Sequence, residues 1–104
     1  MKIVQVTYTT TVTYAEQNIA NIQTVMHDLR QLNNAGINYN ACVGADGKTF
    51  VHTAFFTSGQ QQQVLNNLPS FKFFQQQLTA NGFEAPPKQE LLTLVGSSTT
   101  ILTV

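Results

Sequence analysis

The sequence carries very little charge. Five lysine and arginine residues balance five aspartate and glutamate residues, so 10% of the chain is charged and the formal net charge is zero, whereas soluble domains usually carry about a quarter charged residues. Glutamine, asparagine and threonine supply the polarity instead, as in the glutamine runs at 60–63 and 75–77. Because there is no basic stripe and no basic amphipathic face, the composition argues against binding of nucleic acid or of acidic membranes.

Cysteine is nearly absent as well. Cys42 is the single cysteine, so the chain forms no internal disulfide, which fits a reducing compartment. Residues 1–12 alternate in hydropathy and lack the continuous apolar run of a signal peptide, and no apolar stretch approaches the length of a membrane span. We therefore expect a cytoplasmic protein, and we expect Cys42 to be a small buried hydrophobic residue rather than a nucleophile.

Motifs for metal binding and for common catalytic chemistry are also missing. The two histidines, His27 and His52, are far apart and do not have a metal-ligand spacing. No nucleophile elbow, phosphate-binding glycine loop or dinucleotide fingerprint occurs. We expect no metal and no cofactor, and the residues leave open whether the protein is an enzyme.

What the sequence does contain predicts a single α+β domain over residues 1–104. Residues 2–10 alternate between apolar and polar side chains, as in a half-buried strand. Thr13 and Glu16 have the spacing of a capping box and predict the start of a helix, which we expect to end at residues 33–36, with Gly36 as a left-handed cap or a turn residue. This helix carries one apolar stripe, made of Ile19, Ile22, Val25, Met26, Leu29 and Leu32.

Residues 37–58 predict a β-hairpin, the strongest local signal in the chain. Its turn is at residues 45–48, where Asp-Gly between two runs of β-formers tolerates the positive φ that such a turn needs. We expect this hairpin to form the middle of the sheet. His52 lies on its second strand, four residues before Phe56, so both side chains point to the same face.

Two helical pieces follow the hairpin. Ser58 and Gln61 repeat the capping pattern and predict a helix start. Pro69 removes an amide and clashes with the preceding turn, so we expect a break there, with Pro69 as the first residue of a second piece. That piece extends to about residue 80, and its apolar residues are Phe71, Phe73, Phe74 and Leu78.

A last strand and an apolar tail complete the chain. Pro86 and Pro87 predict an extended lead-in to a strand at residues 91–95. The order strand, helix, strand, strand, helix, strand predicts a ferredoxin-like α+β sandwich with the helices on one face. The other face has almost no charge and is poorly suited to water, so we expect a homodimer that buries sheet against sheet, with residues 97–104 reaching the partner chain.

Several stretches resemble the antibiotic-biosynthesis monooxygenase family of dimeric α+β barrels. They are residues 36–39, residues 46–58, the break at residues 68–72 and the entry to the last strand at residues 86–88. The resemblance implies a dimeric α/β barrel. It also implies either a cofactor-independent monooxygenase that acts on an aromatic phenol or quinol, or a protein that binds such an apolar aromatic small molecule.

The resemblance further implies a pocket between the sheet and the helices. The position that commonly holds an asparagine in the family falls on His52, and the position of a tryptophan falls on Phe56. We therefore identify His52 as the candidate catalytic residue, and Phe56, Phe50, Tyr8 and Phe74 as candidate substrate-binding residues. The second helix has no histidine that would ligate haem, which disfavours haem degradation.

Each candidate has a second interpretation. His52 is either a general base or hydrogen-bond donor toward a phenol, or a partly buried histidine paired with a neighbour. The phenylalanines are either a pocket wall or simply core, and the hydroxyls of Tyr8, Tyr14 and Tyr39 need partners if they are buried. The competing function is a non-catalytic dimeric module with a core filled by phenylalanine. We expect His27 to be exposed.

Overall fold

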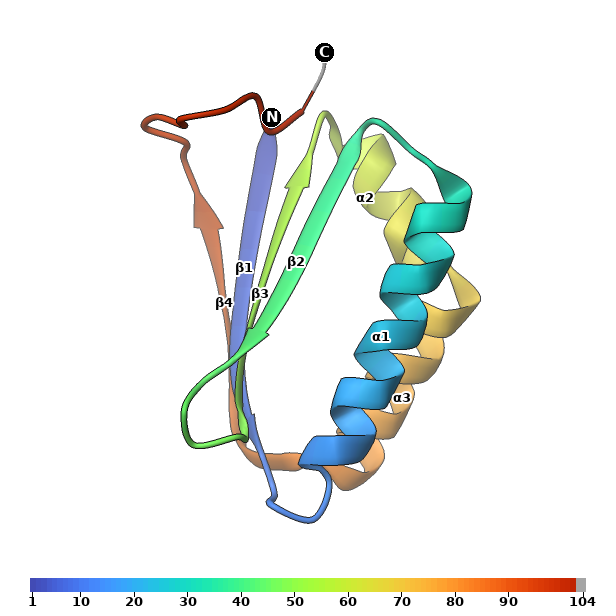
Figure 1. Cartoon of the computed structure of the whole chain (residues 1–104), viewed down its shortest axis with the longest axis vertical. Coiled ribbons are helices and arrows are strands. Elements are labelled where there is room, and N and C mark those ends of the chain that lie inside the picture. Colours follow the sequence, from blue (N-terminus) through green and yellow to red (C-terminus); the bar gives the residue numbers. More distant parts are fainter. Residues whose placement is uncertain (103–104) are drawn as a thin grey trace.

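The structure is a computed structural model that describes residues 1–102. Its strands form one antiparallel sheet in the order β2-β3-β1-β4, and all helices lie against one face of that sheet (Figure 1). The predicted ferredoxin-like α+β fold is therefore confirmed. The elements are β1 (Lys2–Thr10), α1 (Ala15–Leu32), β2 (Ile37–Val43), β3 (Thr49–Phe56), α2 (Gly59–Asn66), α3 (Pro69–Asn81) and β4 (Phe83–Leu92).

The hairpin of β2 and β3 forms, but only half of it is central. β3 pairs with β1, whereas β2 is an edge strand. The turn follows the prediction, with Gly47 at φ +75°. The carboxylate of Asp46 accepts hydrogen bonds from the hydroxyl of Thr49 and from the backbone N–H groups of Lys48 and Thr49. These bonds hold the pKa of Asp46 at about 2 and fix the turn.

The last strand differs from the prediction. β4 begins at Phe83 and ends at Leu92, so it includes both prolines and stops before residues 93–95. Its register against β1 is irregular there, since Thr7 pairs with Lys88 and Thr9 with Ala85. Proline donates no ladder hydrogen bond, but an edge strand with a bulge tolerates it. The expectation that the strand begins only after the prolines was wrong, because the sequence does not reveal that this strand lies at the edge of the sheet.

The helix starts and ends also differ in detail. Side chains provide no cap at α1 or α2: the hydroxyl of Thr13 lies near that of Thr11, and the side-chain oxygen of Gln61 accepts a hydrogen bond from Asn34. The left-handed cap of α1 is Asn33, not Gly36. Gly36 is required for a different reason, because a Cβ there would lie 2.8 Å from atoms of Gln61 and Thr57.

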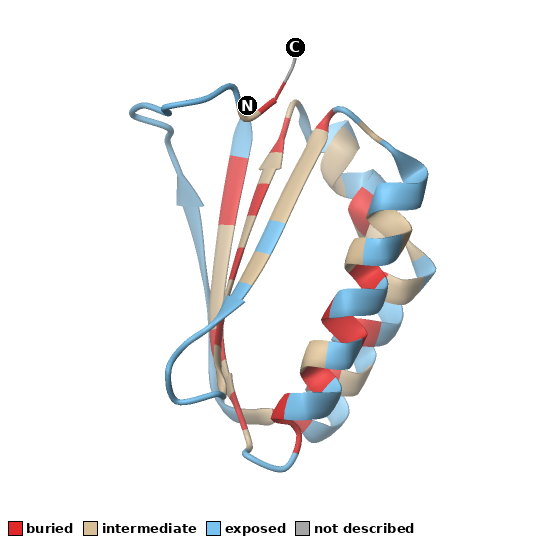
Figure 2. Ribbon diagram, in the orientation of Figure 1, coloured by how far each residue is buried: buried red, intermediate tan, exposed pale blue. Residues whose placement is uncertain are grey.

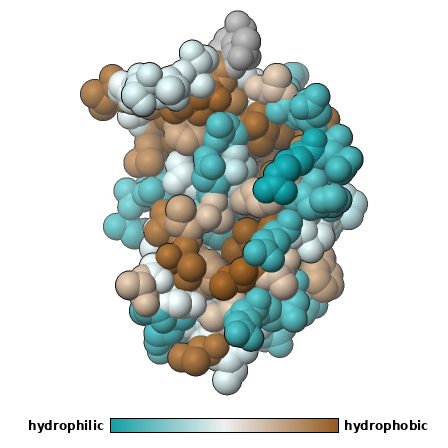
Figure 3. Space-filling model, in the orientation of Figure 1, coloured by the Kyte–Doolittle hydropathy of each residue, from teal (hydrophilic) through white to brown (hydrophobic). Residues whose placement is uncertain are grey.

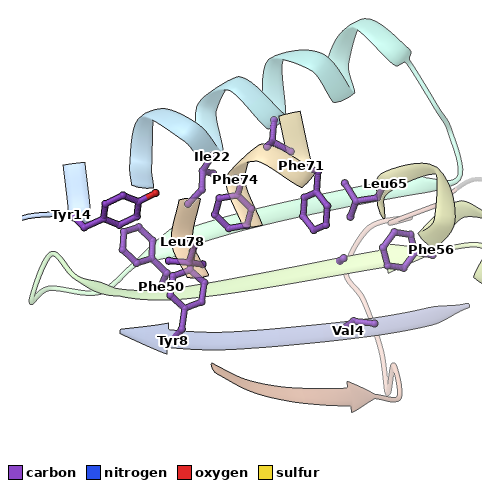
Figure 4. Close-up of a cluster of buried hydrophobic side chains, with 12 residues drawn as sticks. Val4, Tyr8, Tyr14, Ile22, Phe50, Phe56, Leu65, Phe71, Phe74 and Leu78 are labelled. Carbon is purple, nitrogen blue, oxygen red and sulfur yellow. The ribbon is translucent and has the colours of Figure 1, made fainter. Parts of the chain in front are cut away.

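Two further features agree with the sequence pattern: the break between α2 and α3, and the residues that form the core. Pro69 is the first residue of α3, as predicted. Burial alternates along β3 and marks the inner stripe of α1 (Figure 2). The inner faces of the sheet and helices meet in one hydrophobic cluster, shown in Figure 4. Phe73 is the exception in its helix, being 52% exposed, and Cys42 on the edge strand is exposed rather than buried as predicted.

The tail after β4 runs back across the end of the sheet (Figure 1). The side chain of Asn38 on β2 donates a hydrogen bond to the carbonyl of Ile101 at 3.4 Å, and Leu102 is buried. This part of the tail therefore contacts its own chain, while residues 103–104 lie outside the described residues. None of the helices in the described part has the length and hydropathy to cross a bilayer.

Candidate functional site

His52 lies on the inner face of β3 between two tyrosine hydroxyls. The hydroxyl of Tyr8 on β1 is 2.7 Å from its Nε2, and the hydroxyl of Tyr39 on β2 is 2.6 Å from its Nδ1. The sheet register places these side chains together, because Val6 on β1 and Ala41 on β2 both pair with His52. Tyr8 and Tyr39 are each two residues from these partners, so they point to the same face of the sheet as His52. Both ring nitrogens are therefore paired, so His52 reaches a ligand through a tyrosine.

A fourth polar residue joins this group from α1. Asn18 is fully buried, and its Nδ2 donates a hydrogen bond to the Tyr8 hydroxyl at 2.9 Å. Sequence reasoning missed Asn18. A signal was present, since Asn18 interrupts the apolar stripe between Ala15 and Ile22, where a polar residue needs a buried partner. Tyr39 was only one of three tyrosines in need of a partner, and the sequence did not select it.

The whole group is uncharged near neutral pH. Burial lowers the pKa of His52 from 6.5 to about 4, because a charged imidazole loses its hydration there. Burial also raises the pKa of both Tyr8 and Tyr39 well above 10.0. The histidine is therefore a weak base in this state, and the tyrosines keep their protons.

Two adjoining cavities, of about 320 and 120 Å³, lie beside His52 between the sheet and helices α2 and α3. Phe71 and Phe74 extend from α3 toward the sheet (Figure 4), and the Phe74 ring centroid is 5.4 Å from that of His52. The residues that border both cavities are Val6, Tyr39, His52, Phe71, Gln75 and Gln89.

Neither cavity is bordered by an aspartate, glutamate, lysine or arginine side chain. The exposed rim of the larger one is made of Gln75, Thr79, Pro87 and Gln89, while its interior is aromatic and aliphatic. A concave, mostly apolar site with a few converging polar groups is typical of small-molecule binding. Because a charged ligand would lose its hydration here without a counter-charge, the lining favours an uncharged aromatic molecule.

The candidate residues from the sequence separate into two groups. Tyr8 and Phe74 border the larger cavity with His52, and Phe56 borders the smaller one. Phe50 borders neither; it is 1% exposed and stacks on Tyr8 with centroids 5.4 Å apart. Its place is in the core beneath the site.

Larger but more open grooves, of about 630 and 580 Å³, follow the edge between α1 and β2. Figure 3 shows apolar atoms between the polar surface of α1 and the sheet on this side. Arg30 and Tyr39 border both grooves, but His52 borders neither. The smaller cavities therefore remain the candidate site, because only they bring several buried polar groups together. In the described residues no group of three histidine, cysteine or acidic side chains is arranged to hold a metal ion.

Comparison with known proteins gives agreement in structure but not in sequence. No family model and no curated protein matches the sequence. Among solved structures, an antibiotic biosynthesis monooxygenase is 12% identical, with a TM-score of 0.76 over 92% of this chain and 100% of that one. Rv0793 of Mycobacterium tuberculosis is 14% identical, with a TM-score of 0.77 over 94% and 98% of the two chains.

A mutant of SnoaB, a cofactor-independent oxygenase of Streptomyces nogalater, also matches. It is 13% identical, with a TM-score of 0.67 over 95% of this chain and 98% of its own. At such low identities the likeness establishes the fold. The resemblance inferred from the sequence is thus confirmed at that level, and the chain has the fold of the antibiotic biosynthesis monooxygenases.

Proposed function

We propose that the protein binds an uncharged, oxygen-bearing aromatic molecule in the cavities beside His52, as a cofactor-independent monooxygenase of phenols or quinols. The observation that carries this proposal is the pairing of an apolar cavity with the hydrogen-bonded Tyr39–His52–Tyr8 group, in which Tyr8 and His52 are buried. The fold it shares with a cofactor-independent oxygenase supports the reaction class.

The reaction in this proposal needs no cofactor to balance. A phenol that gives its proton to water at the exposed rim of the larger cavity becomes an electron-rich anion, and its ring gives an electron pair to dioxygen. A carbon–oxygen bond forms, the ring hydrogen and the O–O bond are lost, and water leaves, so that 1-naphthol would give 1,4-naphthoquinone. The apolar wall of Phe71, Phe74 and Leu78 would exclude water from the anion.

The test uses two neighbouring glutamines of α3. Gln75 borders both cavities, whereas Gln76 is exposed and borders neither. The Gln75→Trp variant should block the cavities, and the matched Gln76→Trp variant should not. Binding of 1-naphthol by calorimetry, oxygen uptake and quinone formation should all be lost only in Gln75→Trp. If the two variants bind equally, the ligand lies elsewhere; if wild type binds but forms no quinone, the protein is a binder and not an oxygenase.

A non-catalytic assembly module is the second candidate. The observation that favours it is that both ring nitrogens of His52 are already paired within the chain. The cavities beside His52 favour the first candidate, because the phenylalanines do not fill that space. Failure of wild type to bind any aromatic probe would select the module.

Assembly and location complete the proposal. We propose that two copies associate through the sheet face opposite the helices, whose central positions include Thr7, Val51 and Thr53 and bear no charge. Leu92, which pairs with Ile3 on this face and is 38% exposed, extends the apolar surface at its end. The free thiol of Cys42 supports a cytoplasmic location.

A further inference from the structure

Asn18 gives the hydrogen bonds of the site a direction. Its Nδ2 donates to the Tyr8 oxygen, and its Oδ1 is buried without a partner in residues 1–102. The opposite amide orientation would leave two N–H donors unpaired instead of one. Because a buried unpaired N–H is tolerated less well than an unpaired carbonyl, the donating orientation of Asn18 is favoured.

Tyr8 must then place its own proton on another acceptor. Within the described chain the remaining polar partner of its hydroxyl is Nε2 of His52, so Tyr8 donates to Nε2. A neutral imidazole has one acceptor nitrogen and one donor nitrogen. Nδ1 therefore carries the proton of His52 and donates it to the oxygen of Tyr39, 2.6 Å away.

The hydroxyl proton of Tyr39 is the last donor in this series of hydrogen bonds. In residues 1–102 the only hydrogen-bond partner of the Tyr39 hydroxyl is His52, which in this direction is its donor. Tyr39 also borders both cavities. We propose that Tyr39 donates a hydrogen bond to the oxygen of the bound ligand, so that the site selects uncharged aromatic molecules with an acceptor oxygen, such as a quinone carbonyl or a phenol hydroxyl.

This inference rests on the proposed function, namely that the cavities hold an aromatic molecule. It assigns roles that the sequence did not: Tyr39 touches the ligand, whereas Asn18 and Tyr8 are positioning residues that act through His52. A donor aimed at the ligand oxygen also stabilises negative charge there, and this charge develops when a phenol loses its proton.

The direction of the hydrogen bonds is tested without any ligand. Nitrogen-15 NMR of the wild-type chain distinguishes which ring nitrogen of His52 carries the proton, and His52→Gln identifies its resonances. We expect the Nδ1–H tautomer at neutral pH. An Nε2–H tautomer reverses every bond from Tyr39 to Asn18 and overturns the proposal, whatever the protein binds.

Ligand selection is tested with two probes of similar shape, 1,4-naphthoquinone and naphthalene. A Cys42→Ser background is used because an exposed thiol adds to quinones. Adding Tyr39→Phe should weaken binding of the quinone about tenfold, which corresponds to one lost hydrogen bond, and leave naphthalene unchanged. Equal weakening of both probes would overturn the role of Tyr39. If neither probe binds the background protein, the proposed function fails together with the ligand half of this inference, while the NMR result still decides the direction of the bonds.

Discussion

The hydroxyl of Tyr39 lies 2.6 Å from Nδ1 of His52, and this contact joins an edge strand to a central strand. It sets the character of the site, because both ring nitrogens of the histidine that the sequence singled out are paired with tyrosine hydroxyls, and neither is free to bond a ligand. The acid–base chemistry of His52 is therefore that of a buried neutral imidazole, which links the protonation of the site to the stability of the fold.

Burial of His52 should make folding sensitive to acid. Its folded pKa of about 4 lies below the ordinary 6.5, so between these pH values the unfolded chain binds a proton that the folded chain does not. Stability should therefore fall as pH falls from 6.5 to 4, by up to about 3 kcal/mol. Urea unfolding across this range should show the slope in wild type and in His27→Gln, an exposed histidine on α1, but not in His52→Gln. An unchanged slope in His52→Gln would contradict the prediction.

The two faces of α3 should differ strongly in their contribution to stability. Phe74 is 5% exposed in the core, whereas its neighbour Phe73 is 52% exposed. Phe74→Ala should lower the free energy of unfolding by about 3–5 kcal/mol, since it leaves a cavity beside His52. Phe73→Ala should change it by only about 0.5 kcal/mol. Chemical denaturation of both variants measures the difference, and similar losses would mean that the helix is rotated.

The hairpin turn should require glycine at one position. Gly47 has a φ of +75° with open space around it, so a Cβ there meets strain rather than a clash. Gly47→Ala should destabilise the fold by about 1 kcal/mol. Gly59→Ala at the start of α2 is the matched control, because Gly59 also has open space but no positive φ. Thermal unfolding should separate the two variants; if both behave like wild type, the turn adopts another conformation.

Association of two chains should depend on the outer face of the sheet. Light scattering of the wild type should give twice the 11.5 kDa mass of one chain. Thr53→Glu places a charge in the uncharged centre of this face, away from Lys88 and Glu90 on β4, and should give a monomer, whereas Gln76→Glu on the exposed face of α3 should not. A monomeric wild type, or a dimeric Thr53→Glu variant, would refute this interface.

The tail should contribute to its own chain as well. Because Ile101 accepts a hydrogen bond from Asn38 and Leu102 is buried, deletion of residues 97–104 should lower the melting temperature. If the tail also reaches the partner chain, the deletion should weaken the dimer in light scattering at low concentration. A truncated chain that dimerises as tightly as wild type would limit the tail to the intramolecular role.

The sequence by itself determined the order of the elements and the buried face of β1, β3 and α1. Alternation in β1 and β3, the apolar stripe of α1, the Asp46-Gly47 turn and the break at Pro69 all follow from local periodicity and backbone geometry. These signals act within a few residues, so they predict elements and faces well. The same locality explains the error at β4, since only its place at the edge permits Pro86 and Pro87.

Tertiary structure alone decided which residues meet. Asn18, Tyr8, His52 and Tyr39 come from four different elements, and the sheet order β2-β3-β1-β4 sets them side by side. The tertiary structure also leaves Cys42 exposed on an edge strand, and it exposes Phe73 to solvent while Phe74 faces the core. Packing between distant segments fixes such contacts, and no spacing within the chain encodes them directly.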